Sequence, residues 1–364
     1  MKQDYKIEVR DFDCKEEIEE YKNLLKEKWY NNVYYSVEHL QYFAKEQDIL
    51  KYFLLKKSSE AIIMMPFIYR RIVLNEVEEP YFDVISPYGY NGPIFNEDIS
   101  DEELNIFWSL VDQWYKENNV ISEFIRFSLN QNHVGYSGNL IHTLSNVKGL
   151  LKDNFQDQWT AFLPKVRNNY RKALSYNLKF KIYHQDTITK EVIEIFNKIY
   201  TETMKRNNAS SLYFFSDEYF QNLILSNSGN FSIAFAYYED IPISAELIIN
   251  YRKKIFAFLG GTNAEYFSHR PNDFLRVKII DWSINNGFNF YILGGGMKDG
   301  DGLYKSKKAL FPKDDDYMFY TGRKIIDQDI YTMLSIKKDK MYAELSDKDL
   351  KDCFFPYYRK PDVN

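Results

Sequence analysis

Cysteine is almost absent from this sequence. Cys14 and Cys353 are the two cysteines in 364 residues, so neither a disulfide framework nor a four-cysteine zinc site can form. The five histidines are scattered along the chain, and no two of them have the spacing of metal ligands. We therefore expect no metal centre.

Long apolar runs are missing too. The first residues, MKQDYKIEVRDFD, lack the apolar core of a signal peptide. No later run approaches the roughly 18 apolar residues that a transmembrane helix needs. The sequence therefore predicts a cytoplasmic protein without a transmembrane segment.

The chain has no excess of positive charge. Its formal net charge is −5 at pH 7, and the sequence pI is about 5.7. An acidic chain is a poor general binder of nucleic acid, although it can still carry a local basic patch. We expect no DNA partner and leave tRNA open.

Familiar catalytic motifs are absent as well. The sequence contains no G-x-S-x-G, H-E-x-x-H, P-loop or G-x-G-x-x-G, which excludes the usual signatures of serine hydrolases, zinc proteases and nucleotide-binding enzymes. Aromatic residues, in contrast, make up 18% of the chain. Most of them belong in strands and core, and the excess leaves room for a cleft lined with rings, which suits sugars or bases.

The order of the predicted elements repeats along the chain. Each half has the order helix, helix, three strands, loop, helix, strand, and one offset relates Tyr34-Tyr35-Ser36-Val37-Glu38 to Phe214-Phe215-Ser216-Asp217-Glu218. Such repetition indicates two copies of one structural unit. We predict an α/β (α+β) fold with two domains, 1–154 and 155–364. A long helix over 155–176 would join the two units, after a stretch at 129–154 that is irregular or hairpin-like.

The segment 271–311 is the best candidate for a functional site. It predicts a helix capped by Asn272 or Asp273, then a short strand, then the glycines at 294–296. Three successive glycines cost conformational entropy, which favours close approach of a ligand to the backbone. We also expect free backbone N–H groups at 260–263 to bind an anion such as phosphate.

Basic side chains accompany these glycines. Lys305, Lys307 and Lys308 follow the triple glycine, and a lysine in a closed cleft can stabilise developing negative charge. A solvated basic helix end is the alternative for the first and last of them. Arg167 and Arg171 are one helical turn apart, so both can reach one ligand, or else form surface ion pairs.

Several spaced motifs resemble the Fem-type transferases, a family that includes the enzymes of peptidoglycan interpeptide bridges. The motifs are SPYGYNGP at 86–93, VRNNYRKA at 166–173, FAFLGGTNAEY at 256–266, PNDFLRVKIIDW at 271–282, and YILGGG with DGLYKSKKALFP between 291 and 312. The resemblance implies two tandem GNAT-like (N-acetyltransferase) domains, each with a mixed, mostly antiparallel central sheet flanked by helices. That architecture agrees with the repeat.

The resemblance also implies acyl transfer to an amine, with acyl-CoA or aminoacyl-tRNA as cosubstrate and no permanently bound cofactor. The acceptor would be an amine on a cell-envelope precursor, namely a nucleotide-linked amino sugar, a surface polysaccharide or a peptidoglycan peptide. The R/Q-x-x-G-x-G pyrophosphate loop of CoA-dependent GNAT enzymes and the long helical arm of some bridge enzymes are both missing, so the donor stays open. The alternative is a non-catalytic binding or scaffold protein. It is favoured by Ser306 and Leu310, which stand where the family usually has Phe.

The motif match also assigns roles to individual residues. Lys307 takes the position of the family's lysine, and Lys305 is its rival as the catalytic group. The second domain would hold the donor through Gly260, Gly261, Thr262, Asn263, Asn272, Asp273, Arg276, Gly294, Gly295 and Gly296. The acceptor, on the side of the first domain, would contact Tyr88, Tyr90, Arg167, Asn168 and Arg171. No carboxylate stands out as the base, although Asp83, Glu246 and Asp273 are expected near the site.

Overall fold

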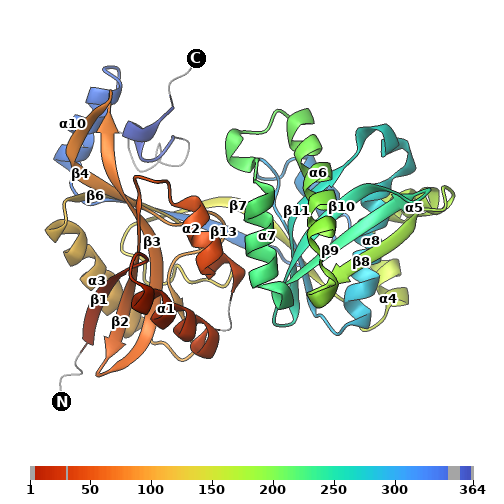
Figure 1. Cartoon of the computed structure of the whole chain (residues 1–364), viewed down its shortest axis with the longest axis horizontal. Helices are drawn as coiled ribbons and strands as arrows, with labels where there is room; N and C mark the ends of the chain where they lie inside the picture. Colours follow the sequence, from red (N-terminus) through yellow and green to blue (C-terminus); the bar gives the residue numbers. More distant parts are fainter. Residues whose placement is uncertain (1–4, 30–31, 343–352, 362–364) are drawn as a thin grey trace. The chain divides into compact units, whose positions relative to one another are not determined.

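The structure is a computed structural model that describes residues 5–29, 32–342 and 353–361 (Figure 1). The chain forms two compact units. The first comprises Met1–Thr143 and Met318–Asn364, and the second comprises Leu144–Tyr317. Within the described ranges, no helix is both long enough and apolar enough to cross a membrane.

The first unit is built on a sheet with the strand order β1-β2-β3-β4-β6-β13. Neighbouring strands are antiparallel, apart from the parallel pair β4 and β6. The strands are β1 (Tyr5–Asp11), β2 (Ile49–Lys57), β3 (Glu60–Leu74), β4 (Val77–Ile85), the short β5 (Ile94–Phe95), β6 (Val120–Arg126) and β13 (Tyr317–Ile325). The helices are α1 (Lys15–Lys28), α2 (Val37–Phe43), α3 (Asp101–Glu117) and α10 (Gln328–Lys338).

Helix α3 shows how local sequence sets an element of this unit. Ser100 Oγ accepts a hydrogen bond from the Glu103 N–H, and the Glu103 carboxylate accepts one from the Ser100 N–H at 2.9 Å. This reciprocal capping box satisfies two N–H groups that would otherwise lack partners. The apolar face of α3 then packs on the sheet through Phe107, Trp108 and Val111.

The second unit has the strand order β7-β12-β11-β10-β9-β8. Among these strands the parallel neighbours are β11 and β12. The strands are β7 (Asn139–Leu150), β8 (Lys179–His184), β9 (Phe231–Tyr238), β10 (Ile241–Tyr251), β11 (Lys254–Thr262) and β12 (Phe290–Gly294). The helices are α4 (Phe155–Ala161), α5 (Pro164–Leu174), α6 (Lys190–Arg206), α7 (Asp217–Ser226), α8 (Pro271–Asn285) and α9 (Gly302–Lys308).

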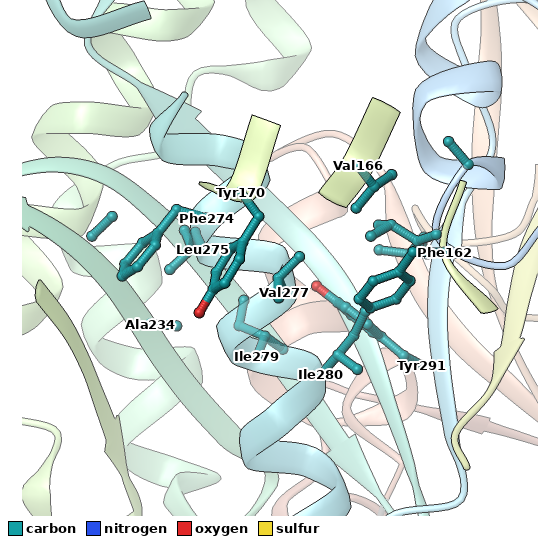
Figure 2. Close-up of a cluster of buried hydrophobic side chains, with 14 of the residues drawn as sticks. Phe162, Val166, Tyr170, Ala234, Phe274, Leu275, Val277, Ile279, Ile280 and Tyr291 are labelled. Carbon is teal, nitrogen blue, oxygen red and sulfur yellow. The ribbon is translucent and has the colours of Figure 1, made fainter. Parts of the chain in front are cut away.

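Helix α8 is the centre of the apolar core of this unit. Phe274, Val277 and Ile280, which recur at helical spacing, are buried, with Ile284 partly buried beside them. Leu275 and Ile279 are buried as well, because α8 packs both on α5 and on the strands β9 and β10. Figure 2 shows the five fully buried residues of α8 named above together with Phe162, Val166, Tyr170, Ala234 and Tyr291.

The element order confirms the predicted repeat. In the first unit the elements run β1-α1-α2-β2-β3-β4-α3-β6, and in the second they run β8-α6-α7-β9-β10-β11-α8-β12, with short 3₁₀ turns and β5 between them. Each copy also places its parallel pair at the same step, β4 with β6 and β11 with β12. The two units are therefore two versions of one mixed α/β design.

The domain boundaries differ from those predicted. Strand β13, late in the chain, pairs with β6, with Thr321 opposite Arg126. Strand β7, which follows β6 in the sequence, pairs instead with β12, with Phe290 opposite Leu150. The last strand of each sheet is thus supplied by the segment that follows the other repeat. A split at 154/155 is wrong for this reason, because residues 318–364 belong to the first unit.

Two predicted elements around that split are also wrong. Residues 129–154 are not merely irregular, since they contain β7; its sequence NLIHTLSNVKGL has many polar residues and little of the alternation that marks a strand. The expected helix 155–176 is two helices, α4 and α5. The first helix ends at Ala161, and the backbone is extended at Phe162 and at Leu163 (φ −61, ψ 151), the conformation that Pro164 at the start of α5 favours for the residue before it. Both helices lie inside the second unit and do not join the two.

Candidate active site

Helix α9 is held in place by the carboxylate of Asp301. This side chain accepts hydrogen bonds from the backbone N–H groups of Met297 at 2.7 Å, Lys298 at 3.1 Å and Tyr304 at 2.9 Å. The bonds favour the charged carboxylate and hold the pKa of Asp301 below its usual value. They also tie the loop after β12 to the first turn of α9, and so fix the orientation of the helix that carries Lys307.

Lys307 is in an unusual setting for a lysine. Its Nζ donates to the carbonyl oxygen of Gly295 at 2.6 Å. Burial, together with the positive charge of Arg276, lowers the pKa of Lys307 to about 8, while Glu246 and Asp301 oppose the shift. Near neutral pH this ammonium therefore carries its charge with little water around it, in a setting where electrostatic interactions are strong.

Three further side chains converge on the same place from different elements. Glu246 of β10 is 5% exposed and accepts a hydrogen bond from the hydroxyl of Tyr291 of β12. The Nε of Arg276, on α8, lies 3.9 Å from the other carboxylate oxygen. Burial raises the pKa of Glu246, against the lowering by Arg276, Tyr291 and Lys307. We call these four residues the Lys307 cluster.

The guanidinium of Arg276 is incompletely paired. Its Nε is buried and has no hydrogen-bond partner among the described residues. A buried N–H without a partner is costly, so an anionic group that accepted from it would bind favourably. The cluster thus offers two cations, one of which can still receive an acceptor. In the described part of the chain, no group of three or more His, Cys, Asp or Glu side chains could hold a metal ion.

The three neighbouring lysines have different environments. Lys308 donates to the Asp314 carbonyl oxygen and pairs with Asp316 at 2.8 Å, so it fastens α9 to the following loop. Lys305 is exposed on the helix surface. Of the three, Lys307 is the lysine that interacts electrostatically with Arg276 and Glu246.

The expectation of free N–H groups at 260–263 is wrong for Thr262 and Asn263. Gly260, Gly261 and Thr262 continue strand β11 and pair with β10, with Gly260 opposite Glu246. The Thr262 N–H donates to Thr203 Oγ1 at 3.0 Å. The Asn263 N–H donates to the Ile243 carbonyl at 2.9 Å. The N–H groups of Thr262 and Asn263 thus have acceptors within the chain, and binding of the donor at 260–263 remains a prediction.

Helix packing explains the glycine at 261. A Cβ on Gly261 would lie 2.6 Å from the Ile199 carbonyl oxygen of α6 and 2.8 Å from Thr203 Oγ1. We expect Gly261→Ala to lower the free energy of unfolding by about 1–3 kcal/mol, measured by urea denaturation, because helix and strand must separate. Gly229→Ala is the matched control, since no atom lies within 4 Å of the added Cβ. Equal stability of the two variants would contradict the packing argument.

Close approach within the chain also accounts for the triple glycine. Gly294 has a left-handed backbone with φ +72. A Cβ on Gly295 would lie 3.0 Å from the Ser145 carbonyl, and one on Gly296 would lie 1.9 Å from Asp301 Oδ1. Because these glycines lack side chains, the loop can lie close to β7 and leaves room for the Asp301 carboxylate. Ligand contact at these residues remains a prediction.

The start of helix α8 differs from the expectation. Its N-cap is Arg270, with φ 57 and ψ 41, and Pro271 follows at the first helical position. Proline suits that position because its fixed φ is helical and its missing N–H needs no partner. Asn272 and Asp273 therefore lie inside the first turn and do not cap it; the former is exposed and the latter partly buried.

The residues predicted to hold the acceptor are distributed over both units. Tyr88 and Tyr90 belong to the first unit. The ring of Tyr88 stacks on Phe43 at 5.0 Å, and that of Tyr90 meets Tyr34 edge-on at 5.3 Å. In the second unit, Arg171 donates to Asn168 Oδ1 at 3.2 Å and lies over the Trp159 ring. Asp83, one of the carboxylates expected near the site, instead pairs with Arg70 and Arg359 in the first unit.

Arg167 also has a structural partner. Its NH1 donates to the carbonyl oxygens of Phe162 and Thr160, the latter at 3.3 Å, and so satisfies the last turn of α4. We expect Arg167→Ala to cost about 1–3 kcal/mol of unfolding free energy, because these carbonyls lose a charged donor. The exposed Lys165→Ala on the same helix is the control. If thermal unfolding showed equal losses, the bonds of Arg167 would be unimportant.

Sequence reasoning underrated one member of the Lys307 cluster and missed another. Glu246 was one of three carboxylates, and Tyr291 was not singled out at all. A signal was present for Glu246, because it is the charged residue inside the apolar run ISAELII of β10. Charged residues in such runs are rarely buried without a partner. For Tyr291, nothing in the sequence distinguished it from the many other strand tyrosines.

Comparison with known proteins is consistent with this geometry. Residues 162–306 match the model of the acetyltransferase (GNAT) domain, a range that contains Glu246, Arg276 and Tyr291 and ends just before Lys307. No curated protein sequence matches the chain. Solved structures with a similar fold include FemX (TM-score 0.61, 13% identity, covering 87% of this chain and 98% of that one).

Two further similar structures are L-PGS from Bacillus licheniformis and a C-terminal domain from Agrobacterium fabrum. For L-PGS the TM-score is 0.55 at 15% identity, covering 88% of this chain and 95% of that one. The second belongs to a putative lysylphosphatidylglycerol synthetase and has a TM-score of 0.53 at 13% identity, covering 85% of this chain and 91% of that one. At these identities the likeness is one of fold.

Proposed function

We propose that this protein is an N-acyltransferase whose reaction takes place at the Lys307 cluster, because residues 162–306 match the model of the acetyltransferase (GNAT) domain and the fold is similar to that of FemX. The observation that carries the proposal is the partly buried ammonium of Lys307, which donates to the Gly295 carbonyl at 2.6 Å close to the charges of Arg276 and Glu246. A fixed positive charge in a site with little water stabilises an oxyanion far better than a solvated lysine does.

The proposed reaction is a simple acyl transfer. The nitrogen of a neutral amine attacks the carbonyl carbon of a thioester or ester, and a tetrahedral intermediate with a negatively charged oxygen forms. Lys307, in its charged form, donates to that oxygen. The intermediate then collapses, the bond to the leaving sulfur or oxygen breaks, and the proton of the amine ends on the leaving group. Water can carry this proton, so no dedicated base is required.

Among the residues expected to hold the acyl donor, Arg276 is the one whose buried side-chain N–H lacks a hydrogen-bond partner within the described part of the chain. Its unpartnered Nε suits a phosphate, and both acyl-CoA and aminoacyl-tRNA carry phosphates. The proposed acceptor is an amine on a cell-envelope precursor. One neighbour in fold is named as a lysylphosphatidylglycerol synthetase, a name that describes an aminoacylated membrane lipid and so fits an envelope role.

The alternative of a non-catalytic scaffold loses its main support. It rested on Ser306 and Leu310 standing where Phe is usual. Ser306 is exposed, and its hydroxyl donates to the Leu303 carbonyl of its own helix. Leu310 is 3% exposed and packs in the apolar core around α8. These substitutions fill structural positions and leave the charged cluster intact.

A ligand panel with a product assay tests the proposal. Acetyl-CoA, CoA, aminoacyl-tRNA and uncharged tRNA would each be added in thermal unfolding, with UDP-linked amino sugars as acceptors. We expect one donor class to raise the midpoint, because a ligand that binds only the native state stabilises it. The matching donor and acceptor should then give an amide product by mass spectrometry. Binding without product would favour the scaffold, and no shift with any donor would overturn the proposal.

A further inference from the structure

We propose that the first unit carries a saccharide-binding site on helix α3, separate from the acyl-transfer chemistry. The surface is hollowed there by about 870 Å³ between α3 and the loop that precedes β7. We call this the α3 hollow and define it by Asn105, Trp108, Asp112, Gln113, Tyr136 and Ser137. Its volume is in the range of sites that hold small organic ligands.

The hollow continues along the helix. A second depression of about 490 Å³ shares Asn105 and Ser109 with the first and extends to Glu102, near the start of α3. The shared residues lie on one helical face, because positions three and four apart are neighbours there. An elongated occupant of two or more rings would suit this shape better than a single compact molecule.

Trp108 gives a specific reason to expect a ligand. Its side chain is 1% exposed, and its Nε1 has no hydrogen-bond partner among the described residues. An indole N–H can only donate, so it needs an acceptor from outside the described chain. Leaving such a group unpaired costs about 1–3 kcal/mol. Because this nitrogen has almost no exposed surface, a hydroxyl oxygen of a bound ligand would remove that cost after a small shift of the ring or of the atoms that cover it.

A buried lysine holds other walls of the hollow in position. Lys324, 7% exposed, donates to Asp112 Oδ1 at 2.5 Å and to Ser137 Oγ at 2.8 Å. It also pairs with the fully buried Glu123, which accepts from the hydroxyl of Tyr136 at 2.9 Å. Three lining side chains are thus oriented by one buried ion pair. A selective site requires polar groups that are already held in fixed positions before the ligand binds.

The charges of the lining favour a neutral, hydroxylated ligand. An anion would meet Asp112 and Glu117, and a cation would meet Lys116 with Lys324 just beneath the surface. The amides of Asn105 and Gln113 and the hydroxyl of Ser137 both donate and accept. Sugar hydroxyls do the same, so each can find a partner here. The chemical class that fits is a neutral saccharide.

The test measures binding of chitobiose and cellobiose to the whole chain by calorimetry and saturation-transfer NMR. We expect at least one disaccharide to bind, and Trp108→Phe and Ser137→Ala to weaken it by about tenfold each, which corresponds to about 1.4 kcal/mol. Trp114→Phe is the matched control on α3, because that ring packs on Phe53 and Phe67. It should bind as the unaltered protein does. Circular dichroism would verify that each variant is folded.

Three results would overturn the inference. The first is that neither disaccharide binds at millimolar concentration. The second is that Trp108→Phe and Ser137→Ala bind with unchanged affinity, which would place the ligand elsewhere. The third is that glucose 6-phosphate binds more tightly than either neutral sugar, which would contradict the charge argument. Because binding is measured without any acyl donor, these outcomes do not depend on whether the chain transfers acyl groups.

Discussion

Lys307→Met should lower the rate of acyl transfer by about 10²–10³-fold, the loss typical of removing one donor to an oxyanion. The unbranched methionine side chain fills much of the same space without a charge. It also removes the cost of burying an ammonium, so we expect no loss of stability. The measurement is kcat with the donor and acceptor found by the ligand panel, together with a thermal unfolding midpoint.

Lys305→Met is the control for this experiment. Lys305 lies two residues away on the same short helix, but it is exposed. It should keep nearly full activity, because a solvated ammonium contributes little to a reaction in a buried site. Full activity of Lys307→Met would move the role to Lys305 or to backbone donors. Loss of both activity and folding in Lys307→Met would assign the lysine a structural role instead.

The pH dependence of the reaction should shift in opposite directions in two variants of the Lys307 cluster. If the charged lysine stabilises the oxyanion, kcat falls as the pH rises through the lysine's pKa, near 8. The charge of Arg276 lowers that pKa, so Arg276→Gln should move the alkaline limb of the pH–rate profile, the part in which kcat falls, to higher pH. Glu246 raises it, so Glu246→Gln should move the limb to lower pH.

The expected size of each displacement is about one pH unit, the usual effect of one nearby charge. Glutamine at 246 can still accept from the Tyr291 hydroxyl, which keeps the shape of the site. The measurement is kcat from pH 6 to pH 10 at saturating substrate. Displacement of both limbs in the same direction would mean that another group controls the profile. A rise through pH 8 that disappears in Lys307→Met would show that Lys307 acts as a base, whereas a rise kept in that variant belongs to another group, such as the substrate amine, which must be neutral to attack.

Local patterns predicted the repeated elements well. The capping box of Ser100 and Glu103 and the apolar stripe of α8 are set by neighbours in sequence, which is why patterns of this kind can be read without the structure. Strand β7 and the path of β13 depend on partners far away in the chain, so periodicity could not reveal them. Pro164 was visible in the sequence, and its effect on Leu163 could have been used to break the predicted helix at 155–176.

The site was predicted less completely than the fold. Lys307 and Arg276 came from a motif match, and the structure places them together with Glu246 and Tyr291. The glycine positions were taken as ligand contacts, although Gly261 and Gly296 are explained by atoms of the chain itself. Glycine indicates close approach in a sequence but does not identify what approaches. The difference appears only when Ile199 and Asp301 are seen beside them.

The last strand of each sheet comes from the segment that follows the other repeat. This arrangement determines the order in which the two sheets can be completed during synthesis. All strands of the second sheet lie in one continuous stretch, from β7 to β12. The first sheet must wait for β13, which leaves the ribosome after the whole second unit. Until then the edge of β6 has no partner, and open strand edges promote aggregation. The unit made first is therefore finished last, and rapid translation of residues 144–325 would shorten the interval during which the nascent chain is vulnerable.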